Sequence, residues 1–264
     1  NLKAQHQFDV LVNSSNFEEI KGQSFELVVC AGAYARKWYA NQHPEEDREH
    51  IETLIGLLKT IKAERLLLIS TIDVYTAGTA AAGGANEDFD CASQENHAYG
   101  TNRLALETAV ASTFDSYSIV RLPGLFGPGL KKNVIFDLIN QNCLSQINLA
   151  SSFQYFDLRQ LQSFISTVLS ERLRLVNIFT EPIATEEIVR RFFPEAAESC
   201  FRDESKAAHY DLRTKFDRTF GGGGGYVQSK AQLLEQLESY IKSEGASEQE
   251  AGGIKHSLEP ATRS

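Results

Sequence analysis

Residues 65–75 read RLLLISTIDVY, and this stretch decides the fold class. Its first part, residues 65–71, is a nearly continuous apolar run that ends in Ser70 and Thr71. A run without polar alternation is typical of a strand that is covered on both faces, as in a parallel sheet. Four more short apolar runs predict further strands: Phe8–Asn13, Glu26–Ala31, Ser118–Leu122 and Leu175–Thr180.

Longer segments with a helical period separate these strands. Pro44 and the acidic residues 45–47 fit a first helical turn, where the helix dipole favours negative charge. A second helix is expected over Tyr99–Val110, and a third, capped by Thr185, ends before Pro194. The alternation of strands and helices predicts an α/β fold with a doubly wound, mostly parallel sheet.

Small and polar residues mark the breaks in this pattern. Gly78–Gly84 is expected to be a flexible loop and the five glycines Gly221–Gly225 a loop or hinge, because glycine has the greatest backbone freedom. Ser229 and Gln232 resemble a capping box at the start of a final amphipathic helix. From about Ser243 the chain is rich in Glu, Ser, Gly and Ala, which predicts a disordered tail over residues 243–264.

The composition narrows the class of protein. Of 264 residues, 35 are acidic and 26 basic, which gives a net charge of −9 and argues against a nucleic-acid partner. No apolar run approaches the roughly 18 residues of a membrane helix, so neither a membrane partner nor a membrane location is expected. The 4 cysteines lie far apart, which favours free thiols over a metal site or disulfides. Together these features are typical of a cytoplasmic enzyme.

A candidate chemical site joins the end of strand 65–71 to the helix that starts near Tyr99. Arg103 follows Tyr99 by one helical turn, so the two side chains share a helix face. A cation near a phenol favours the phenolate and lowers the pKa of the phenol. Thr71 can donate a hydrogen bond to a substrate oxygen while Tyr99 exchanges its proton with that oxygen.

Four segments carry motifs in a fixed order. Residues 29–33 read VCAGA, residues 70–75 match S-[ST]-x-x-V-Y, and residues 99–103 match Y-G-x-x-K except for an Arg in the Lys place. Residues 120–129 look like [IV]-x-R-x-x-x-[VL]-[YF]-G-P-G. In this order the segments resemble the extended short-chain dehydrogenases, also called NAD-dependent epimerase/dehydratases, over about residues 8–195.

The resemblance implies a Rossmann-type dinucleotide-binding core over residues 1–150 and a small substrate-side region over residues 151–242. It implies NAD or NADP as cofactor and a hydroxyl or carbonyl group of a sugar-like small molecule or sugar nucleotide as substrate. A homodimer is the family-level expectation. The implied catalytic set is Thr71, Tyr99 and Arg103, of which Tyr99 and Arg103 also contact the cofactor. The other implied cofactor contacts are Ala31, Gly32, Ala33, Leu122 and Pro123.

The sequence departs from the family pattern in several places. Arg103 replaces a lysine that, in the family, bonds the nicotinamide ribose and lowers the pKa of the tyrosine. No glycine-rich phosphate turn precedes Phe8, which suggests that about 10–15 residues before Asn1 are missing. Residues 153–158 lack the arginine that pairs with a substrate diphosphate. Residues 14–16 lack the acidic residue that favours NAD, so the choice between NAD and NADP stays open.

Alternative interpretations accompany these assignments. The replacement of lysine by Arg103 favours a rival function, a non-catalytic NAD(P)-binding sensor or scaffold of the same fold. An isomerase that returns its hydride is a third function. Arg103 could instead form a helical salt bridge with Glu107, and Asp73 could be a solvated or capping carboxylate. For Arg121 a buried ion pair is as well supported as a role beside the site.

Overall fold

The computed structural model describes residues 8–13 and 15–256, with the side chains of the last helix described up to residue 244. Its centre is a parallel sheet with the strand order β1-β2-β3-β7. This confirms the doubly wound α/β prediction. The strands are β1 (Ser24–Cys30), β2 (Lys62–Thr71), β3 (Tyr117–Leu122) and β7 (Leu175–Asn177), so four of the five predicted runs lie in the sheet.

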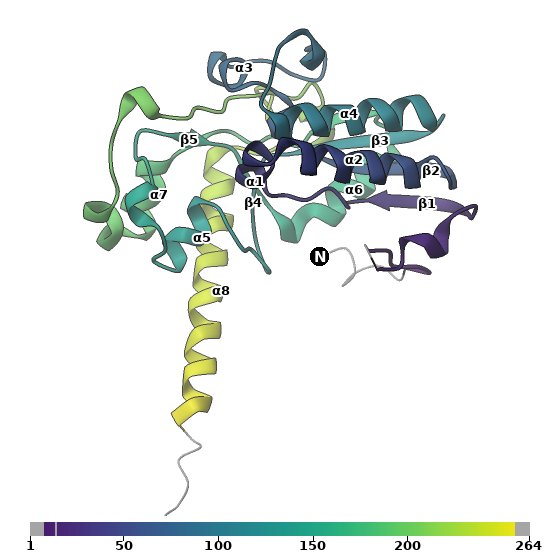
Figure 1. The fold of residues 1–264 in the computed structure, drawn as a ribbon. Coiled ribbons are helices and arrows are strands. Elements are labelled where there is room, and N and C mark those ends of the chain that lie inside the picture. Colours follow the sequence, from purple (N-terminus) through teal and green to yellow (C-terminus); the bar gives the residue numbers. More distant parts are fainter. Residues whose placement is uncertain (1–7, 14, 257–264) are drawn as a thin grey trace, which may run out of the picture.

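Helices cover both faces of this sheet (Figure 1). On one face, Leu66 and Leu68 of β2 pack in a cluster with residues of α2 (Pro44–Leu58) and α4 (Ala98–Thr113). The intervening Leu67 points to the other face and packs in a cluster with residues of α6 (Leu161–Ser170). Successive strand residues face opposite sides of a sheet, so a strand covered on both sides needs an unbroken apolar run.

A second, smaller part of the molecule has its own apolar core. Two short sheets belong to it: β4 (Gly124–Phe126) pairs with β6 (Tyr155–Asp157), and β5 (Ser152–Phe153) pairs with β8 (Ile183–Ala184). One buried cluster joins residues of β4, β6 and β8 to three helices. These helices are α5 (Val134–Ile139), α7 (Thr185–Phe192) and α8 (Lys230–His256).

Short helices complete the connections. Two are α-helical, α1 (Lys37–Gln42) and α3 (Ala77–Ala82). The others are 3₁₀ turns: η2 (Phe17–Ile20), η3 (Ile72–Val74), η4 (Cys91–Ser93), η5 (Leu144–Gln146), η6 (Leu158–Gln160), η7 (Pro194–Ser199), η8 (Glu204–Lys206) and η9 (Asp217–Phe220). Within the described part of the chain, no helix is long and apolar enough to cross a membrane.

The strand predicted over Phe8–Asn13 is wrong, because this segment is not a strand in the part of the chain that the structure describes. Its apolar side chains are 40–46% exposed at Val10, Leu11 and Val12. Asn16 closes a tight turn at its end, where its side chain bonds the backbone of Asn13 and Leu11. An apolar run becomes a strand only when a neighbouring strand satisfies its backbone groups.

The flexible loop predicted over Gly78–Gly84 is also wrong for most of that segment. Residues 77–82 of the supposed Gly78–Gly84 loop form α3, which Thr76 caps through the backbone N–H of Thr79. Alanines favour helix there, and Gly83 ends the helix with φ of 75°. The disordered tail over residues 243–264 stays a prediction: α8 extends as far as His256, and residues 257–264 lie outside the described residues.

Predictions about other helix ends and loops have mixed outcomes. The capping box is confirmed, since Ser229 and Gln232 bond each other's backbone N–H groups at the start of α8. The glycine run Gly221–Gly225 is confirmed as a turn-rich loop. Thr185, expected to be a cap, is instead the first residue of α7.

Candidate functional site

The predicted cofactor contacts lie at the carboxyl edge of the parallel sheet. Ala31, Gly32 and Ala33 directly follow β1. Leu122 ends β3, and Pro123 follows it. Thr71 ends β2 and lies opposite Leu122 in the strand register. Parallel strands bring the ends of distant segments to one edge, and in open α/β sheets this edge is where ligands bind. The residues after β1 are exposed or half-buried, whereas Leu122 and Pro123 are buried.

Tyr99 enters this edge from the first turn of α4. His97 caps the helix by accepting a hydrogen bond from the backbone N–H of Gly100 at 3.0 Å. Gly100 lies so close to the turn after β2 that an added Cβ would come within 2.3 Å of the carbonyl oxygen of Asp73. Only a residue without a side chain permits this approach, and it sets the helix start against the end of β2.

Arg103 lies beside Tyr99 but has different partners from those predicted. Its guanidinium carbon lies 4.3 Å from the centre of the Tyr99 ring, over the ring. Its Nη1 and Nη2 atoms bond the two carboxylate oxygens of Asp47 at 2.7 and 2.9 Å, and Nη2 also bonds the carbonyl oxygen of Tyr34 at 2.6 Å. Glu107, the alternative partner for Arg103, pairs with Arg121 instead.

The two members of this ion pair are buried, each with a side chain 4% exposed. Burial alone would raise the pKa of Asp47, but hydrogen bonds from Arg103 and Asn102 outweigh it and lower that pKa. The charge of Arg103 is therefore largely neutralised inside the protein. Its terminal nitrogens are held against α2 and the loop after β1.

The phenol of Tyr99 is correspondingly less acidic than predicted. Tyr99 is 7% exposed, and burial raises its pKa. Arg103 and Thr71 act in the opposite direction, while the charge of Asp73 adds to the rise. The fold therefore does bring Thr71, Tyr99 and Arg103 together. The net rise in pKa runs against the expectation that Arg103 makes the phenol unusually acidic.

A second polar cluster near Thr71 was not found from the sequence. Asp73 follows Thr71 by two residues, and its Oδ1 accepts hydrogen bonds from Lys37 at 2.7 Å and from the phenol of Tyr210 at 3.1 Å. Thr71 Oγ1 lies 3.4 Å from the other carboxylate oxygen. Asp73 is thus neither a free surface carboxylate nor only a cap. Lys37 and Tyr210 are 173 residues apart, so no local pattern could have paired them.

Arg121 and Glu107 form a buried ion pair at 2.6 Å between β3 and α4, which confirms one of the two alternatives for Arg121. Ser70 donates a hydrogen bond to the same carboxylate, and Arg121 also bonds the phenol of Tyr75 at 3.0 Å. These groups satisfy one another inside the core. Their role is to hold β2, β3 and α4 in register beneath the site.

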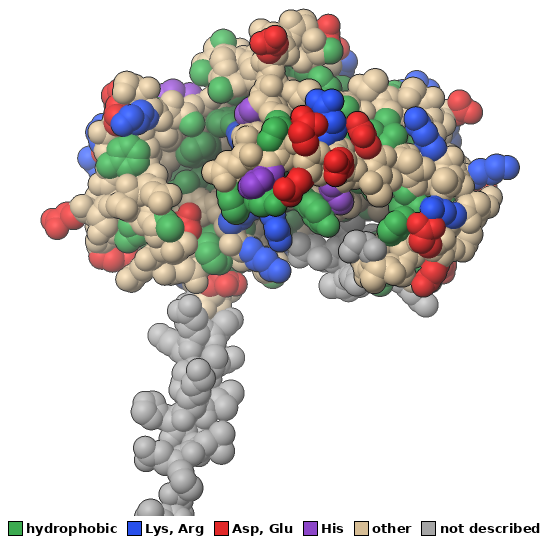
Figure 2. Space-filling model, viewed as in Figure 1, with side chains coloured by type: hydrophobic (Ala, Val, Ile, Leu, Met, Phe, Trp, Pro, Cys, Tyr) green, Lys and Arg blue, Asp and Glu red, His purple; other side chains and the backbone are tan. Residues whose placement is uncertain are grey.

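Basic side chains gather below α1 in Figure 2, on a face that is hollowed between the part carrying α1 and the part carrying α7. The charges of both Arg36 and Asp73 act on Lys132, so these three residues lie near one another. Burial and Arg36 together lower the pKa of Lys132. The positive side chains on this hollowed face would attract an anionic group.

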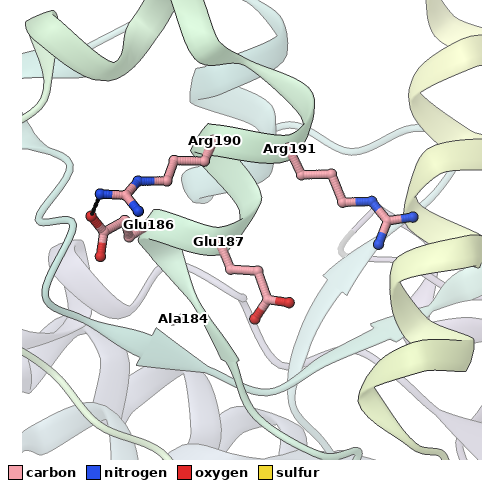
Figure 3. A pocket seen from close by; sticks show the side chains of 5 residues that line it. All are labelled: Ala184, Glu186, Glu187, Arg190 and Arg191. Atoms are coloured by element: carbon pink, nitrogen blue, oxygen red, sulfur yellow. Dashed lines mark ion pairs between the residues drawn. The ribbon is translucent and has the colours of Figure 1, made fainter.

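A pocket of about 400 Å³ lies elsewhere, over α7 (Figure 3). Its walls are Ala184, Glu186, Glu187, Arg190 and Arg191. Glu186 and Arg190 pair with each other at 2.6 Å, and Arg191 turns toward α8, where it pairs with Glu238. None of these five residues belongs to the predicted site. We therefore place the candidate site at the sheet edge.

The comparison with protein families agrees with this geometry. The model of the NAD dependent epimerase/dehydratase family matches residues 2–165. The chain belongs to this family. The family match covers β1 to β6, together with Thr71, Tyr99 and Arg103. No curated protein matches the chain.

Solved structures share the fold at low sequence identity. RMD from Pseudomonas aeruginosa, in complex with NADPH, is 16% identical, with a TM-score of 0.62 over 82% of this chain and 81% of that one. A double mutant of DesIV, a dTDP-glucose 4,6-dehydratase from Streptomyces venezuelae with NAD and DAU bound, is 15% identical, with a TM-score of 0.64 over 86% and 75%. MoeE5 in complex with UDP-glucuronic acid and NAD is 19% identical, with a TM-score of 0.60 over 88% and 82%.

Proposed function

We propose that this family member is an NAD(P)-dependent oxidoreductase of the epimerase/dehydratase type. Its substrate is a sugar nucleotide or a similar sugar-like molecule, on which it acts at a hydroxyl or carbonyl group. The main support is the meeting of Thr71 and Tyr99 at the carboxyl edge of the sheet, beside small residues at the end of β1. Three relatives of the same fold are described with NADPH or NAD, and MoeE5 with UDP-glucuronic acid.

The residues at the sheet edge fit a dinucleotide in part. Gly32 is exposed, and an added Cβ there would meet only the side chain of Leu54, at 3.5 Å, so the backbone is open to a ligand on its other side. Ala31, Gly32 and Ala33 would therefore hold the cofactor, with Leu122 and Pro123 behind it. When bound, the cofactor would accept or donate a hydride. Arg103 does not fit the ribose-binding role, because Asp47 and Tyr34 occupy its terminal nitrogens.

In this proposal Tyr99 exchanges a proton with the substrate oxygen. Thr71, whose hydroxyl interacts with the same phenol, orients that oxygen by a hydrogen bond. Arg103 contacts the ring of Tyr99 with its guanidinium group. It also fixes the position of α4, because it bonds Asp47 of α2. We thus assign Arg103 a positioning role in place of direct contact with the cofactor.

Replacement of Tyr99 by Phe tests the proposal. With NAD and either UDP-glucuronic acid or dTDP-glucose as probes, Tyr99→Phe should lower kcat about 100- to 10,000-fold, because it removes the exchangeable proton. Fluorescence titration with NADH should give a Kd close to that of the wild type. Turnover equal to the wild type would refute the assignment of Tyr99.

A second candidate function is a non-catalytic NAD(P)-binding sensor or scaffold. The neutralised charge of Arg103 and the raised pKa of Tyr99 favour it, since both weaken the predicted acid–base pair. NADH binding without conversion of any sugar nucleotide by the wild type would favour this function. The cytoplasmic location, the homodimer and the domain boundaries stay predictions under either function.

A further inference from the structure

Lys37, Asp73 and Tyr210 form a cluster that the proposed Thr71–Tyr99 pair does not use. Lys37 Nζ lies 2.7 Å from Asp73 Oδ1 and 3.1 Å from the phenol oxygen of Tyr210. The phenol in turn donates a hydrogen bond of 3.1 Å to the same carboxylate oxygen. A cation, a carboxylate and a phenol are therefore all within hydrogen-bond distance of one another.

Three separate parts of the fold supply this cluster. Lys37 begins α1, shortly after the end of β1, and Asp73 lies in η3 at the end of β2. Tyr210 belongs to the segment beside β5, where its backbone N–H donates to the carbonyl oxygen of Ser152 at 3.1 Å. The cluster thus joins the carboxyl edge of the main sheet to the second part of the molecule.

The cation of this cluster is more exposed than the cation beside Tyr99. Arg103 pairs with Asp47 and has a side chain that is 4% exposed. Lys37 likewise pairs with a carboxylate, that of Asp73, but its side chain is 39% exposed and its ammonium group also lies within hydrogen-bond distance of a phenol oxygen. Tyr210 is half-buried, so the cluster is not sealed inside the core.

We propose that Tyr210 is a second acid–base group of this site, which exchanges a proton with a hydroxyl or carbonyl oxygen of the substrate. The inference rests on the proposed function. Epimerisation and elimination of water both move protons at more than one position, and a single phenol serves only one of them. Tyr99 and Tyr210 lie near the same carboxylate, since the charge of Asp73 acts on both phenols.

The proposed step is a proton transfer without change of oxidation state. The phenolate of Tyr210 takes the proton of a substrate hydroxyl, so one O–H bond breaks as another forms. In the reverse direction the phenol returns the proton to a substrate oxygen. The Lys37 ammonium stabilises the phenolate in both directions, and Asp73 positions Lys37 and the phenol. Lys37 and Asp73 are thus positioning residues.

Lys37 and Asp73 are the charged groups that act on the Tyr210 phenol. Burial raises the pKa of Tyr210 and Asp73 raises it further, whereas Lys37 lowers it. The Lys37 ammonium survives partial burial because Asp73 and Tyr210 raise its pKa. Loss of the charge at Lys37 must therefore make the phenolate of Tyr210 harder to form.

Turnover by the full chain, with NAD and with UDP-glucuronic acid or dTDP-glucose as probes, provides the first test. Tyr210→Phe should lower kcat about 100-fold or more while KM stays within about threefold. The matched control is Tyr226→Phe, since Tyr226 also bonds a carboxylate, that of Asp211, and lies under Arg213, but belongs to neither cluster of the site. Wild-type kcat in Tyr210→Phe, beside an inactive Tyr99→Phe, would overturn the inference and leave the proposed function intact. A wild type that converts neither probe counts against the proposed function itself.

Ultraviolet absorbance of the phenolate provides a second test that needs no turnover. The titration step that disappears in Tyr210→Phe should move to higher pH in Lys37→Met and return toward its wild-type position in Lys37→Arg. In an active enzyme, the rising limb of kcat/KM against pH should move the same way. A step that stays in place in Lys37→Met overturns the inference, whether or not the protein turns over. Circular dichroism identifies any variant that fails to fold.

Discussion

Arg103 and Asp47 form a two-point ion pair, with Nη1–Oδ2 and Nη2–Oδ1 distances of 2.7 and 2.9 Å, that fastens α4 to α2. The pair lies directly beneath Tyr99, whose ring covers the guanidinium group at 4.3 Å. A planar guanidinium matches a carboxylate at two points, which a lysine ammonium cannot do. An arginine at this position therefore supports the site from inside the fold.

Arg103→Lys should lower the free energy of unfolding by about 1–3 kcal/mol, because the ammonium cannot keep both bonds to Asp47 together with the bond to the Tyr34 carbonyl. Urea denaturation measures this change. The control is Arg190→Lys, at an exposed pair with Glu186, where a change below about 0.5 kcal/mol is expected. Equal stability of Arg103→Lys and the wild type would contradict the role of the two-point pair.

Restoration of lysine at 103 also separates the two candidate functions. In the proposed enzyme, Arg103 only positions Tyr99, so Arg103→Lys should leave turnover unchanged or lower it. A large gain in hydride transfer, followed through nicotinamide absorbance, would instead indicate a protein that has lost its catalytic cation.

Asp47→Asn should destabilise the protein by about 3–5 kcal/mol near neutral pH, because it leaves the Arg103 charge buried without its partner. The pKa of Asp47 is lowered in the folded state, so its contribution is present above the ordinary carboxyl pKa and is lost as the pH falls through the folded value. The stability gap between wild type and Asp47→Asn should therefore narrow below about pH 4.

Urea denaturation at a series of pH values from neutral to acidic measures this gap. Glu45→Gln, an exposed position on the same helical turn, is the control and should change stability by less than about 0.5 kcal/mol throughout. A gap that stays constant down to pH 3 would show that the Asp47 carboxylate contributes nothing through its charge.

Gly100→Ala should lower the free energy of unfolding by about 1–3 kcal/mol, because its Cβ would come within 2.3 Å of both the Asp73 carbonyl and the Asn96 side chain. Helix α4 must then move away from the end of β2, so turnover should fall as well. Gly56→Ala in α2 is the matched control. Its Cβ meets nothing within 4 Å, and it should stabilise the protein by about 0.5–1 kcal/mol. Thermal unfolding that ranks both variants alike would contradict this packing.

The sheet was largely predictable because a strand that is buried on both faces has an unbroken apolar run in its sequence. The run before Thr71 and the runs of β1, β3 and β7 each became a strand. The same pattern failed at Phe8–Asn13, since whether an apolar run pairs with a neighbour depends on strands that are distant in sequence. The Gly78–Gly84 segment shows the converse error, as alanines between glycines formed a short helix.

By itself, the sequence determined that strands alternate with helices, that Tyr99 and Arg103 share one helix face, and that Thr71 ends a buried strand. These are consequences of local periodicity, which a short stretch of chain carries within itself. Only the tertiary structure determined which groups the charged side chains of the site bond. Arg103 bonds Asp47 across 56 positions, and Lys37 meets Tyr210 across 173. Long-range charge pairs depend on how helices and loops pack, because burial determines which charge each cation must neutralise.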